Sequence, residues 1–307
     1  MYLCRMLPTS RKELDLLEYG NVDIILFSGD AYVDHPSFGP AVIGRVLESQ
    51  GYRVAIVPQP NWRDDLRDFK KLGIPRLFFG VTAGNMDSMV NHYTAARRLR
   101  SNDAYTPEGR AGMRPDYAVT VYTRILKQLY PDIPVIIGGI EASLRRLTHY
   151  DYWSDSLKQS VLADSGADYL VYGMGERSIT ELAQKIREHA PVSEIRKIRQ
   201  IAYVADHSGE IYSPSGKVLQ LPSHQACRKS KRTFSEHFRI IEEHANVYEP
   251  PVLAEPLDHP DGPTVVVNPP FPPMTASQLD AVYDLPFSYQ AHPRYKGKKI
   301  PALEMIR

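Results

Sequence analysis

Four short polar loops, each containing glycine, carry many of the residues in this sequence that could contact a ligand. They comprise residues 29–39, 80–87, 138–143 and 173–176. Each loop follows an apolar stretch and leads toward a segment with helical spacing. Glycine lets the backbone approach a ligand closely, and the free N–H groups at a helix N-terminus bind an anion or a polar amide. These loops therefore predict a binding face for a cofactor or a small molecule.

The candidate contacts on this face include carboxylates, an imidazole, hydroxyls, an amide and backbone glycines. They are Asp30, Tyr32, His35, Thr82, Asn85, Gly138, Gly139, Glu141, Arg145, Gly173, Gly175 and Glu176. The same glycines also suit the ordinary turns of any α/β fold, so a purely structural role stays open. Neither the Gly-x-Gly-x-x-Gly fingerprint nor a P-loop occurs, which argues against a NAD-binding domain and a P-loop ATPase.

The run of residues 144–155 is the densest group of functional side-chain types. Its two adjacent arginines fit an anionic ligand. Alternatively, its aromatic residues form a buried cluster whose polar groups satisfy one another. A third reading is a metal-dependent hydrolase that uses His149, Asp151 and Asp155. The basic run at residues 228–232 is expected to be the solvated start of a helix, so a nucleic-acid partner is not indicated.

Apolar stretches that alternate with helical segments must position these loops. The expected strands are residues 22–27, 53–57, 76–79, 134–137 and 168–172. The expected helices are residues 40–50, 62–72, 85–97, 116–130, 154–163 and 176–188. This alternation predicts an α/β fold with a doubly wound parallel five-stranded sheet, of the Rossmann or flavodoxin type. Ligands bind such sheets outside the carboxyl ends of the strands, where the four loops fall.

The character of the sequence changes near residue 190. Residues 1–190 are expected to form the Rossmann-like domain, and residues 191–307 a Pro-rich α+β extension. The extension is expected to contain a hairpin, a strand and two helices. These are residues 201–204 with 209–212, residues 264–267, and residues 230–248 and 277–284.

The composition bounds the class of protein. With 43% hydrophobic residues, 24% charged residues and a net charge of +1, the chain is expected to be globular and without a nucleic-acid-binding surface. The two cysteines, Cys4 and Cys227, cannot form a disulfide framework or a four-thiolate metal site, so no metal site is expected and a reducing cytoplasm fits. No apolar stretch is long enough for a membrane helix, and residues 1–11 do not resemble a signal peptide.

Several long runs in this sequence closely resemble those of YgiQ-type radical SAM proteins. They are Ser-Gly-Asp-Ala-Tyr-Val-Asp-His-Pro-Ser-Phe-Gly (28–39), Gly-Val-Thr-Ala-Gly-Asn-Met-Asp-Ser-Met (80–89), Gly-Gly-Ile-Glu-Ala-Ser-Leu-Arg-Arg (138–146), His-Tyr-Asp-Tyr-Trp-Ser-Asp (149–155) and Ile-Pro-Ala-Leu-Glu-Met-Ile-Arg (300–307). The resemblance spans almost the whole chain. Such long runs are far more specific than the short motifs considered above.

The resemblance implies an N-terminal, cobalamin-binding-like Rossmann domain that precedes a radical SAM barrel. In that family the barrel holds a [4Fe–4S] cluster on a Cys-x-x-x-Cys-x-x-Cys motif, and the cluster reduces S-adenosylmethionine to a 5′-deoxyadenosyl radical. No such motif occurs in this sequence. The chain is therefore expected to be a catalytically silent fragment that ends before the cysteines. Its expected partners are its own barrel and, for the whole enzyme, a small-molecule or unknown substrate.

Cobalamin is a further possible cofactor by resemblance. Cobalamin domains that supply an axial histidine use Asp-x-His-x-x-Gly, whereas here Asp34 directly precedes His35, and Gly39 follows four residues later. The spacing therefore departs from that motif, and binding without a histidine ligand, or no binding, stays open. Residues 173–176 do resemble the Gly-x-Gly-Glu loop of those domains. The alternative function is a stand-alone flavodoxin-like module that binds cobalamin or a nucleotide without catalysis.

Overall fold

The computed structural model describes residues 6–206, 211–245 and 247–306. Contacts within the chain divide it into two compact units. The first unit combines Met1–Glu141 with Met274–Arg307, and the second unit is Ala142–Pro273. The domain boundary that the sequence predicts near residue 190 lies inside the second unit and stays a prediction. Cys4, one of the two cysteines of the chain, lies outside the described residues.

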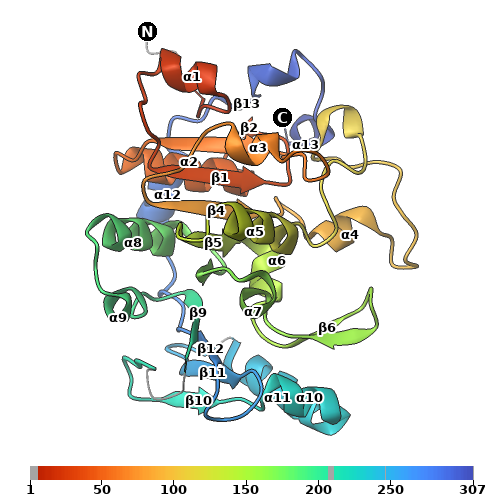
Figure 1. Cartoon of the computed structure of the whole chain (residues 1–307), viewed down its shortest axis with the longest axis vertical. Helices are drawn as coiled ribbons and strands as arrows, with labels where there is room; N and C mark the ends of the chain where they lie inside the picture. The colour runs from red at the N-terminus through yellow and green to blue at the C-terminus, as the bar shows by residue number, and fades with distance from the viewer. Residues whose placement is uncertain (1–5, 207–210, 246, 307) are drawn as a thin grey trace. The chain divides into compact units, whose positions relative to one another are not determined.

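The first unit contains a parallel sheet, its covering helices and a late segment that returns from the C-terminal part of the chain (Figure 1). Its strands are β1 (Ile24–Ser28), β2 (Val33–Asp34), β3 (Val54–Pro58), β4 (Phe78–Thr82), β5 (Val135–Gly138) and β13 (Gln290–Ala291). Its helices are α1 (Arg11–Leu16), α2 (Gly39–Ser49), α3 (Arg67–Lys70), α4 (Ser88–His92), η1 (Pro107–Gly109), α5 (Ala118–Leu129), α12 (Ala276–Tyr283), η3 (Pro293–Tyr295) and α13 (Pro301–Met305).

The main sheet of this unit has the strand order β3-β1-β4-β5. All three pairings are parallel, with Ile24 opposite both Val54 and Phe78, and Phe79 opposite Val135. Strand β1 lies between β3 and β4, so the chain winds first to one side of β1 and then to the other. This is the doubly wound α/β arrangement that the sequence predicts.

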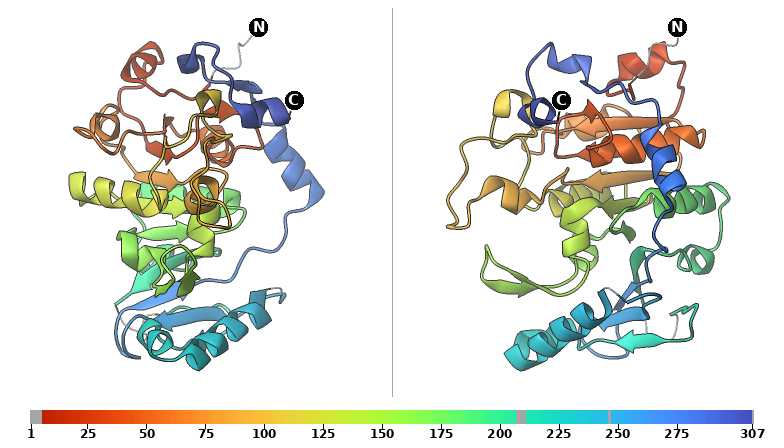
Figure 2. Two further views of the ribbon diagram at one scale, coloured as in Figure 1. Left: turned by 90° about the vertical axis from the view of Figure 1, so that its right-hand side faces the viewer. Right: turned by 180° about the vertical axis from the view of Figure 1, so that it is seen from behind.

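Alternation along each strand sends neighbouring side chains to opposite faces of the sheet. On one face, Phe27 stacks on Phe69 of α3 with ring centroids 5.2 Å apart, and Phe69 lies 5.8 Å from Tyr122 of α5. On the other face, Leu26 faces Gly44 of α2, where an added Cβ would lie 3.6 Å from the Leu26 side chain. The sheet is thus covered on both faces, with α2 on one side and α3 and α5 on the other (Figures 1 and 2).

The second unit combines a mixed sheet with a hairpin and several helices. Its strands are β6 (His149–Asp151), β7 (Ser156–Lys158), β8 (Tyr169–Val171), β9 (Ile201–Ala205), β10 (Val218–Gln220), β11 (Val252–Pro256) and β12 (Thr264–Val267). Its helices are α7 (Val161–Ser165), α8 (Glu176–Arg187), α9 (Val192–Ile195), α10 (His224–Lys229) and α11 (Lys231–Ala245), and α6 (Gly139–Leu144) carries the chain into this unit.

The sheet of the second unit runs in the order β8-β9-β12-β11-β10. Strand β9 pairs antiparallel with both β8 and β12, β12 pairs antiparallel with β11, and β10 pairs parallel with β11. The fifth predicted strand therefore forms, but its partner within this unit is antiparallel. The predicted count of five strands is too low, because the region after residue 190 adds β9 to β12.

Several predicted elements differ from those observed. Residues 154–163 do not form one helix, because β7 pairs with β6 as a hairpin and only the last residues enter α7. The helices predicted at 62–72 and 85–97 shorten to α3 and α4. The predicted hairpin partner at 209–212 falls partly outside the described residues, and β9 pairs with β12 instead.

The late segment of the first unit closes over the loop that follows β1. Strand β13 pairs antiparallel with β2, and the Ser288 backbone N–H donates to Asp34 Oδ2 over 2.9 Å. The hydroxyl of Tyr295 accepts the Tyr32 backbone N–H over 2.7 Å. Asp34 is fully buried and also forms a two-pronged ion pair with Arg45 of α2. Residues far apart in sequence therefore complete this loop.

Candidate functional site

A buried group of charges lies beyond the carboxyl ends of β1 and β4, where the winding direction reverses. Arg114 Nη1 donates to Asp30 Oδ1 over 2.6 Å and to the Ala83 carbonyl over 2.7 Å. Arg114 Nη2 donates to Asp103 Oδ2 over 2.8 Å. All three charged side chains are at most 2% exposed. The crevice in which ligands bind in related folds is thus partly filled by a guanidinium of the chain itself.

Burial acts in opposite directions on the pKa values of Asp30 and Arg114, and the charges of the neighbouring groups oppose it in both cases. It raises the pKa of Asp30 to about 6, although the Arg114 guanidinium opposes the shift. The two carboxylates around Arg114 raise the pKa of the guanidinium against the effect of its own burial. Arg114 is therefore a permanent cation that keeps Asp30 ionised near neutral pH.

Asn85 ties the loops after β1, β2 and β4 together. Its backbone N–H donates to Asp30 Oδ2 over 2.7 Å, and its side-chain amide bonds both Gly39 N (3.0 Å) and the Ser37 carbonyl (2.7 Å). Gly84, at φ +112°, packs directly against the Asp30 carboxylate, where a Cβ would overlap it. The structure thus brings Asp30 and Asn85 into direct contact, as a shared edge of the sheet predicts.

Thr82 and Glu141 have local structural partners on the same edge. The Thr82 hydroxyl accepts the Gly84 N–H over 3.2 Å, and a Cβ at Gly139 (φ +85°) would lie 2.5 Å from that hydroxyl. Gly138, which ends β5, comes just before it. The buried Glu141 carboxylate accepts the N–H groups of Ser88 (2.8 Å) and Val119 (2.9 Å). Burial raises the pKa of Glu141, and these bonds oppose that shift.

Tyr32 and His35 lie in the loop that the late segment covers. Tyr32 is buried, its hydroxyl accepts the Leu7 N–H over 3.2 Å, and its ring stacks on that of His292. The His35 ring packs edge-on against Tyr289, with centroids 5.1 Å apart. Both side chains therefore hold the loop to its neighbours.

His35 does not fit the role of an axial cobalt ligand of cobalamin. Its Nδ1 atom accepts the Ser37 backbone N–H over 3.0 Å. A neutral imidazole has one acceptor nitrogen, so the proton resides on Nε2 and neither nitrogen offers a free lone pair. Burial lowers the pKa of His35, which favours this neutral form.

The remaining candidates belong to the second unit. Gly173, at φ +65°, donates its N–H to Ser143 Oγ over 3.2 Å, and Gly175 precedes Glu176 at the start of α8. Arg145 is 9% exposed, and burial lowers its pKa to about 10. Within the second unit they stay candidate ligand contacts.

The histidine and carboxylates of the run 144–155 contact different neighbours. His149 Nδ1 bonds the Leu147 carbonyl over 3.0 Å, Asp151 accepts the Ser154 N–H over 2.9 Å, and the Tyr150 hydroxyl donates to Asp155. Among the described residues, no group of three or more His, Cys, Asp or Glu side chains is placed to hold a metal ion. The geometry therefore gives no support to the metal-dependent hydrolase.

Cys227 does not fit the role of an iron–sulfur ligand. It is a free thiol, 1% exposed, in α10 of the second unit. Burial raises the pKa of its thiol to about 11, so the thiolate that binds iron is disfavoured. No step of cluster chemistry is assigned to this side chain.

A cavity of about 380 Å³ lies in the first unit, next to the buried charge group. It is formed by the segment after β3, by α4 and by the long loop that leads to α5. Its lining residues are Trp62, Arg63, Asn91, His92, Tyr93, Leu99, Arg100, Asn102, Asp103, Ala111, Gly112, Arg114, Pro115 and Asp116. The volume is in the range of small-molecule sites.

A histidine–aspartate pair forms one wall of this cavity. His92 Nδ1 and Asp116 Oδ1 are 2.7 Å apart, and Asp116 Oδ2 accepts the Tyr93 hydroxyl over 2.8 Å. A carboxylate in this position holds the imidazole in one orientation and one tautomer. None of these three residues is among the sequence-based candidates.

The doubly wound sheet, the buried charges at its carboxyl edge and the adjacent cavity define an α/β domain with a candidate ligand site. The chain belongs to the family described as Radical SAM N-terminal, whose sequence profile matches residues 6–307. Among the described residues, none of the helices is long and apolar enough to span a membrane.

Curated relatives share this sequence over nearly its whole length. A UPF0313 protein of Porphyromonas gingivalis is 59% identical over 98% of this chain and 47% of its own length. The UPF0313 protein YgiQ of Escherichia coli K12 is 43% identical over 98% of this chain and 47% of its own length. The chain therefore spans about half the length of the curated relatives that it matches.

Among solved structures, the radical S-adenosylmethionine methyltransferase TsrM from Kitasatospora setae, with tryptophan substrate and a SAM analogue bound, shows a distant similarity. The two chains are 20% identical, with a TM-score of 0.37, over 59% of this chain and 28% of that one.

Proposed function

We propose that this chain is the N-terminal accessory domain of a radical SAM iron–sulfur enzyme. The observation that carries the proposal is the family match over residues 6–307, together with relatives about twice as long. In this proposal a barrel domain elsewhere in the whole protein holds the [4Fe–4S] cluster and S-adenosylmethionine. The cluster would supply the electron that cleaves S-adenosylmethionine reductively, and this chain supplies none of its ligands.

The role proposed for this chain is to hold a cofactor or the substrate, or to cover the mouth of the barrel. The buried charge group and Asn85 support this role, because their hydrogen bonds hold the strand-end loops to one another. Loops fixed in this way present their backbone groups to a ligand without a large ordering cost. Asp30 and Glu141 act through other residues in this view, because their carboxylates are already engaged.

The full-length relative from Porphyromonas gingivalis provides the direct test. It would be purified without oxygen, supplied with iron and sulfide, and incubated with S-adenosylmethionine and dithionite. We expect 5′-deoxyadenosine, detected by mass spectrometry, from the full-length protein and none from residues 1–307 alone. A full-length protein that binds no cluster, or a cluster-bearing protein that forms no 5′-deoxyadenosine, contradicts the proposal.

The cavity next to Arg114 favours a second candidate function, a stand-alone flavodoxin-like module that binds a cofactor without catalysis. Cobalamin, FMN and S-adenosylmethionine would each be added to residues 1–307 and thermal unfolding followed. A specific ligand at 100 times its Kd adds roughly 2.7 kcal/mol to the free energy of unfolding. The absence of a rise in Tm with all three contradicts this candidate.

The proposed location is the cytoplasm. The buried free thiol of Cys227 supports it, because a reducing compartment keeps such thiols unpaired. The net charge of +1 gives no reason to propose a nucleic-acid partner.

A further inference from the structure

Three buried polar atoms of the cavity lining have no hydrogen-bond partner within the described part of the chain. They are Asn91 Nδ2, His92 Nε2 and Arg114 Nε. The side chains of Asn91 and Arg114 are at most 6% exposed, and that of His92 is 9% exposed. A buried polar group without a partner costs on the order of 1–3 kcal/mol. Three such groups around one cavity leave hydrogen-bonding capacity for a bound molecule.

The chemistry of these atoms selects the kind of ligand. Asn91 Nδ2 and Arg114 Nε are hydrogen-bond donors only, so their partners must be acceptors. His92 Nε2 donates when both ring nitrogens carry a proton and accepts when only Nδ1 does. Oxygen atoms of an anion satisfy Asn91 and Arg114 in either case, and they satisfy His92 in its doubly protonated form.

The charges of the lining favour an anion as well. Both lining carboxylates already have partners, since Asp103 accepts from Arg114 and Asp116 accepts from Tyr93 and pairs with His92. The guanidinium groups of Arg63 and Arg100 are exposed at the rim, and they bond no carboxylate over the described residues. The carboxylates of the cavity lining therefore do not neutralise the positive charges of Arg63 and Arg100.

The remaining wall of the cavity is apolar. It is formed by Trp62, Tyr93, Leu99, Ala111 and Pro115. The Arg63 guanidinium stacks on the Trp62 ring, with its central carbon 4.5 Å from the ring centroid. An aromatic wall beside a cationic wall accommodates a flat organic body that carries an anionic group.

We propose that this cavity binds a small organic anion, with its phosphate or carboxylate oxygens at Asn91, His92, Arg100 and Arg114 and its apolar body against Trp62. The inference stands apart from the proposed radical SAM function, because it uses only residues that line the cavity. It also places the binding groups in α4 and in the loop before α5, outside the strand-end glycines that the sequence singles out.

Isothermal titration of residues 1–307 tests the proposal with matched pairs of probes. Adenosine 5′-monophosphate is compared with adenosine, and phenylacetate with phenylacetamide, while inorganic phosphate tests the anion alone. We expect at least one organic anion to bind with a Kd below about 1 mM, and its neutral partner to bind at least about tenfold more weakly. The pair that binds distinguishes a phosphate from a carboxylate ligand.

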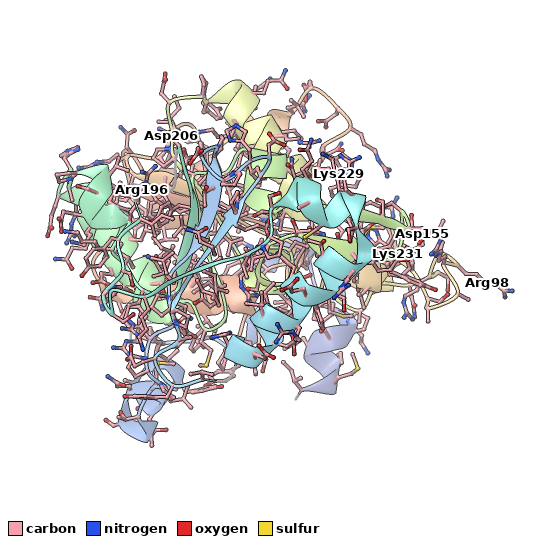
Figure 3. All side chains as sticks on the ribbon, turned by 90° about the horizontal axis from the view of Figure 1, so that it is seen from below. Arg98, Asp155, Arg196, Asp206, Lys229 and Lys231 are labelled. Atoms are coloured by element: carbon pink, nitrogen blue, oxygen red, sulfur yellow. The ribbon has the colours of Figure 1, made fainter. Side chains whose placement is uncertain are left out.

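Two substitutions at the rim and one at a buried lining residue locate the site. Arg100→Gln is expected to weaken binding of the anion about tenfold, because a charged donor is lost. Arg98→Gln is the matched control, since Arg98 is on the same segment, does not line the cavity and points away from the neighbouring side chains (Figure 3). Asn91→Asp, which keeps the side-chain size and adds a negative charge, is expected to abolish binding.

Three outcomes overturn the proposal. They are no binding of either organic anion below about 1 mM, equal binding of an anion and its neutral partner, and equal effects of Arg98→Gln and Arg100→Gln. Circular dichroism is used to check that each variant is folded. The two arginine variants decide the result if Asn91→Asp does not fold. Failure of the 5′-deoxyadenosine test leaves these results unaffected, so the two proposals can fail separately.

Discussion

At the scale of single residues, Gly84 determines how closely the loop after β4 approaches the loop after β1. Its backbone is left-handed, at φ +112°, and a Cβ at this position would overlap the Asp30 carboxylate. Glycine is required twice here, once for the backbone conformation and once for the space. The ion pair between Asp30 and Arg114 depends on that close approach.

The variant Gly84→Ala is expected to lower the free energy of unfolding by about 3 kcal/mol, from backbone strain and from displacement of Asp30. Urea denaturation followed by circular dichroism measures the loss. Gly20→Ala is the control, because no atom lies within 4 Å of its added Cβ and its φ is not positive. Equal stability of the two variants would show that the close approach is not needed.

A second residue-scale prediction concerns pH. Thr148 Oγ1 donates to Glu255 Oε1 over 2.8 Å, so it must accept from His224 Nδ1, 2.9 Å away. Burial lowers the pKa of His224. The folded state then binds fewer protons than the unfolded state below the ordinary histidine pKa of about 6.5, and stability is lost as the pH falls through that value.

The free energy of unfolding is therefore expected to decrease between about pH 7.5 and pH 5.5. His224→Asn keeps a donor for Thr148 and removes the titration, so its decrease should be smaller. Urea denaturation at each pH compares the two chains. Because Asp30 and Glu141 are present in both, their opposite contributions cancel in the comparison. Identical pH dependence of the two chains would exclude this role of His224.

At the scale of elements, one side chain anchors the starts of two helices. Glu141, in α6, accepts the N–H of Ser88 at the start of α4 and the N–H of Val119 at the start of α5. The first N–H groups of a helix have no partner within it, and a carboxylate there also interacts favourably with the helix dipole. Helix α4 carries the lining residues Asn91 and His92, and α5 begins just after the lining residue Asp116.

Glu141→Gln is expected to lower the free energy of unfolding by about 2–3 kcal/mol, because one of the two buried N–H groups then faces an NH₂ group. Thermal unfolding checks this value. The exposed Glu18 provides the control substitution Glu18→Gln, which should change stability by less than about 0.5 kcal/mol. Unchanged stability of the Glu141→Gln variant would mean that water or another group accepts the N–H groups of these helices.

The elements also show what the sequence could and could not predict. Continuous apolar runs identify β1, β3, β4, β5 and β8, because strands buried on both faces need no polar alternation. Strand order and direction are not encoded in such runs, so the antiparallel pairing of β8 with the additional strand β9 could not be predicted from them. The hairpin β6–β7 was missed because its residues fit helical spacing as well.

Some residues of the candidate site could also be predicted from the sequence, and others could not. Strand-end loops are local features, so Asp30 and Asn85 could be placed on one edge from sequence. Arg114 could not, because its partner Asp30 is 84 positions away and the surrounding segment is as polar as a solvated loop. A cluster of arginines before a helix is the one signal that could have drawn attention to it.

At the scale of the whole molecule, the first unit is assembled from both ends of the sequence. The Tyr295 hydroxyl accepts the N–H of Tyr32, 263 positions earlier, and partial burial of Tyr295 raises the pKa of its phenol to about 12. Closure of the late segment therefore stabilises a loop at the edge of the parallel sheet.

Tyr295→Phe leaves the buried N–H of Tyr32 without its acceptor, and a loss of about 1–2 kcal/mol in the free energy of unfolding is expected. Denaturation in urea measures it. Tyr283→Phe, at an exposed tyrosine of α12, removes a hydroxyl of the same kind and should have little effect. A similar response of the two variants would show that the late segment is held by packing alone.

The discontinuity of the first unit has a consequence for the newly made chain. Residues 274–307 leave the ribosome only after the whole second unit has been synthesised. At 5–20 residues per second, the early part waits on the order of ten seconds for the strand that pairs with β2. During that time Asp34 and Tyr32 lack their late partners, so the nascent protein passes through a stage in which this loop is open to chaperones and proteases.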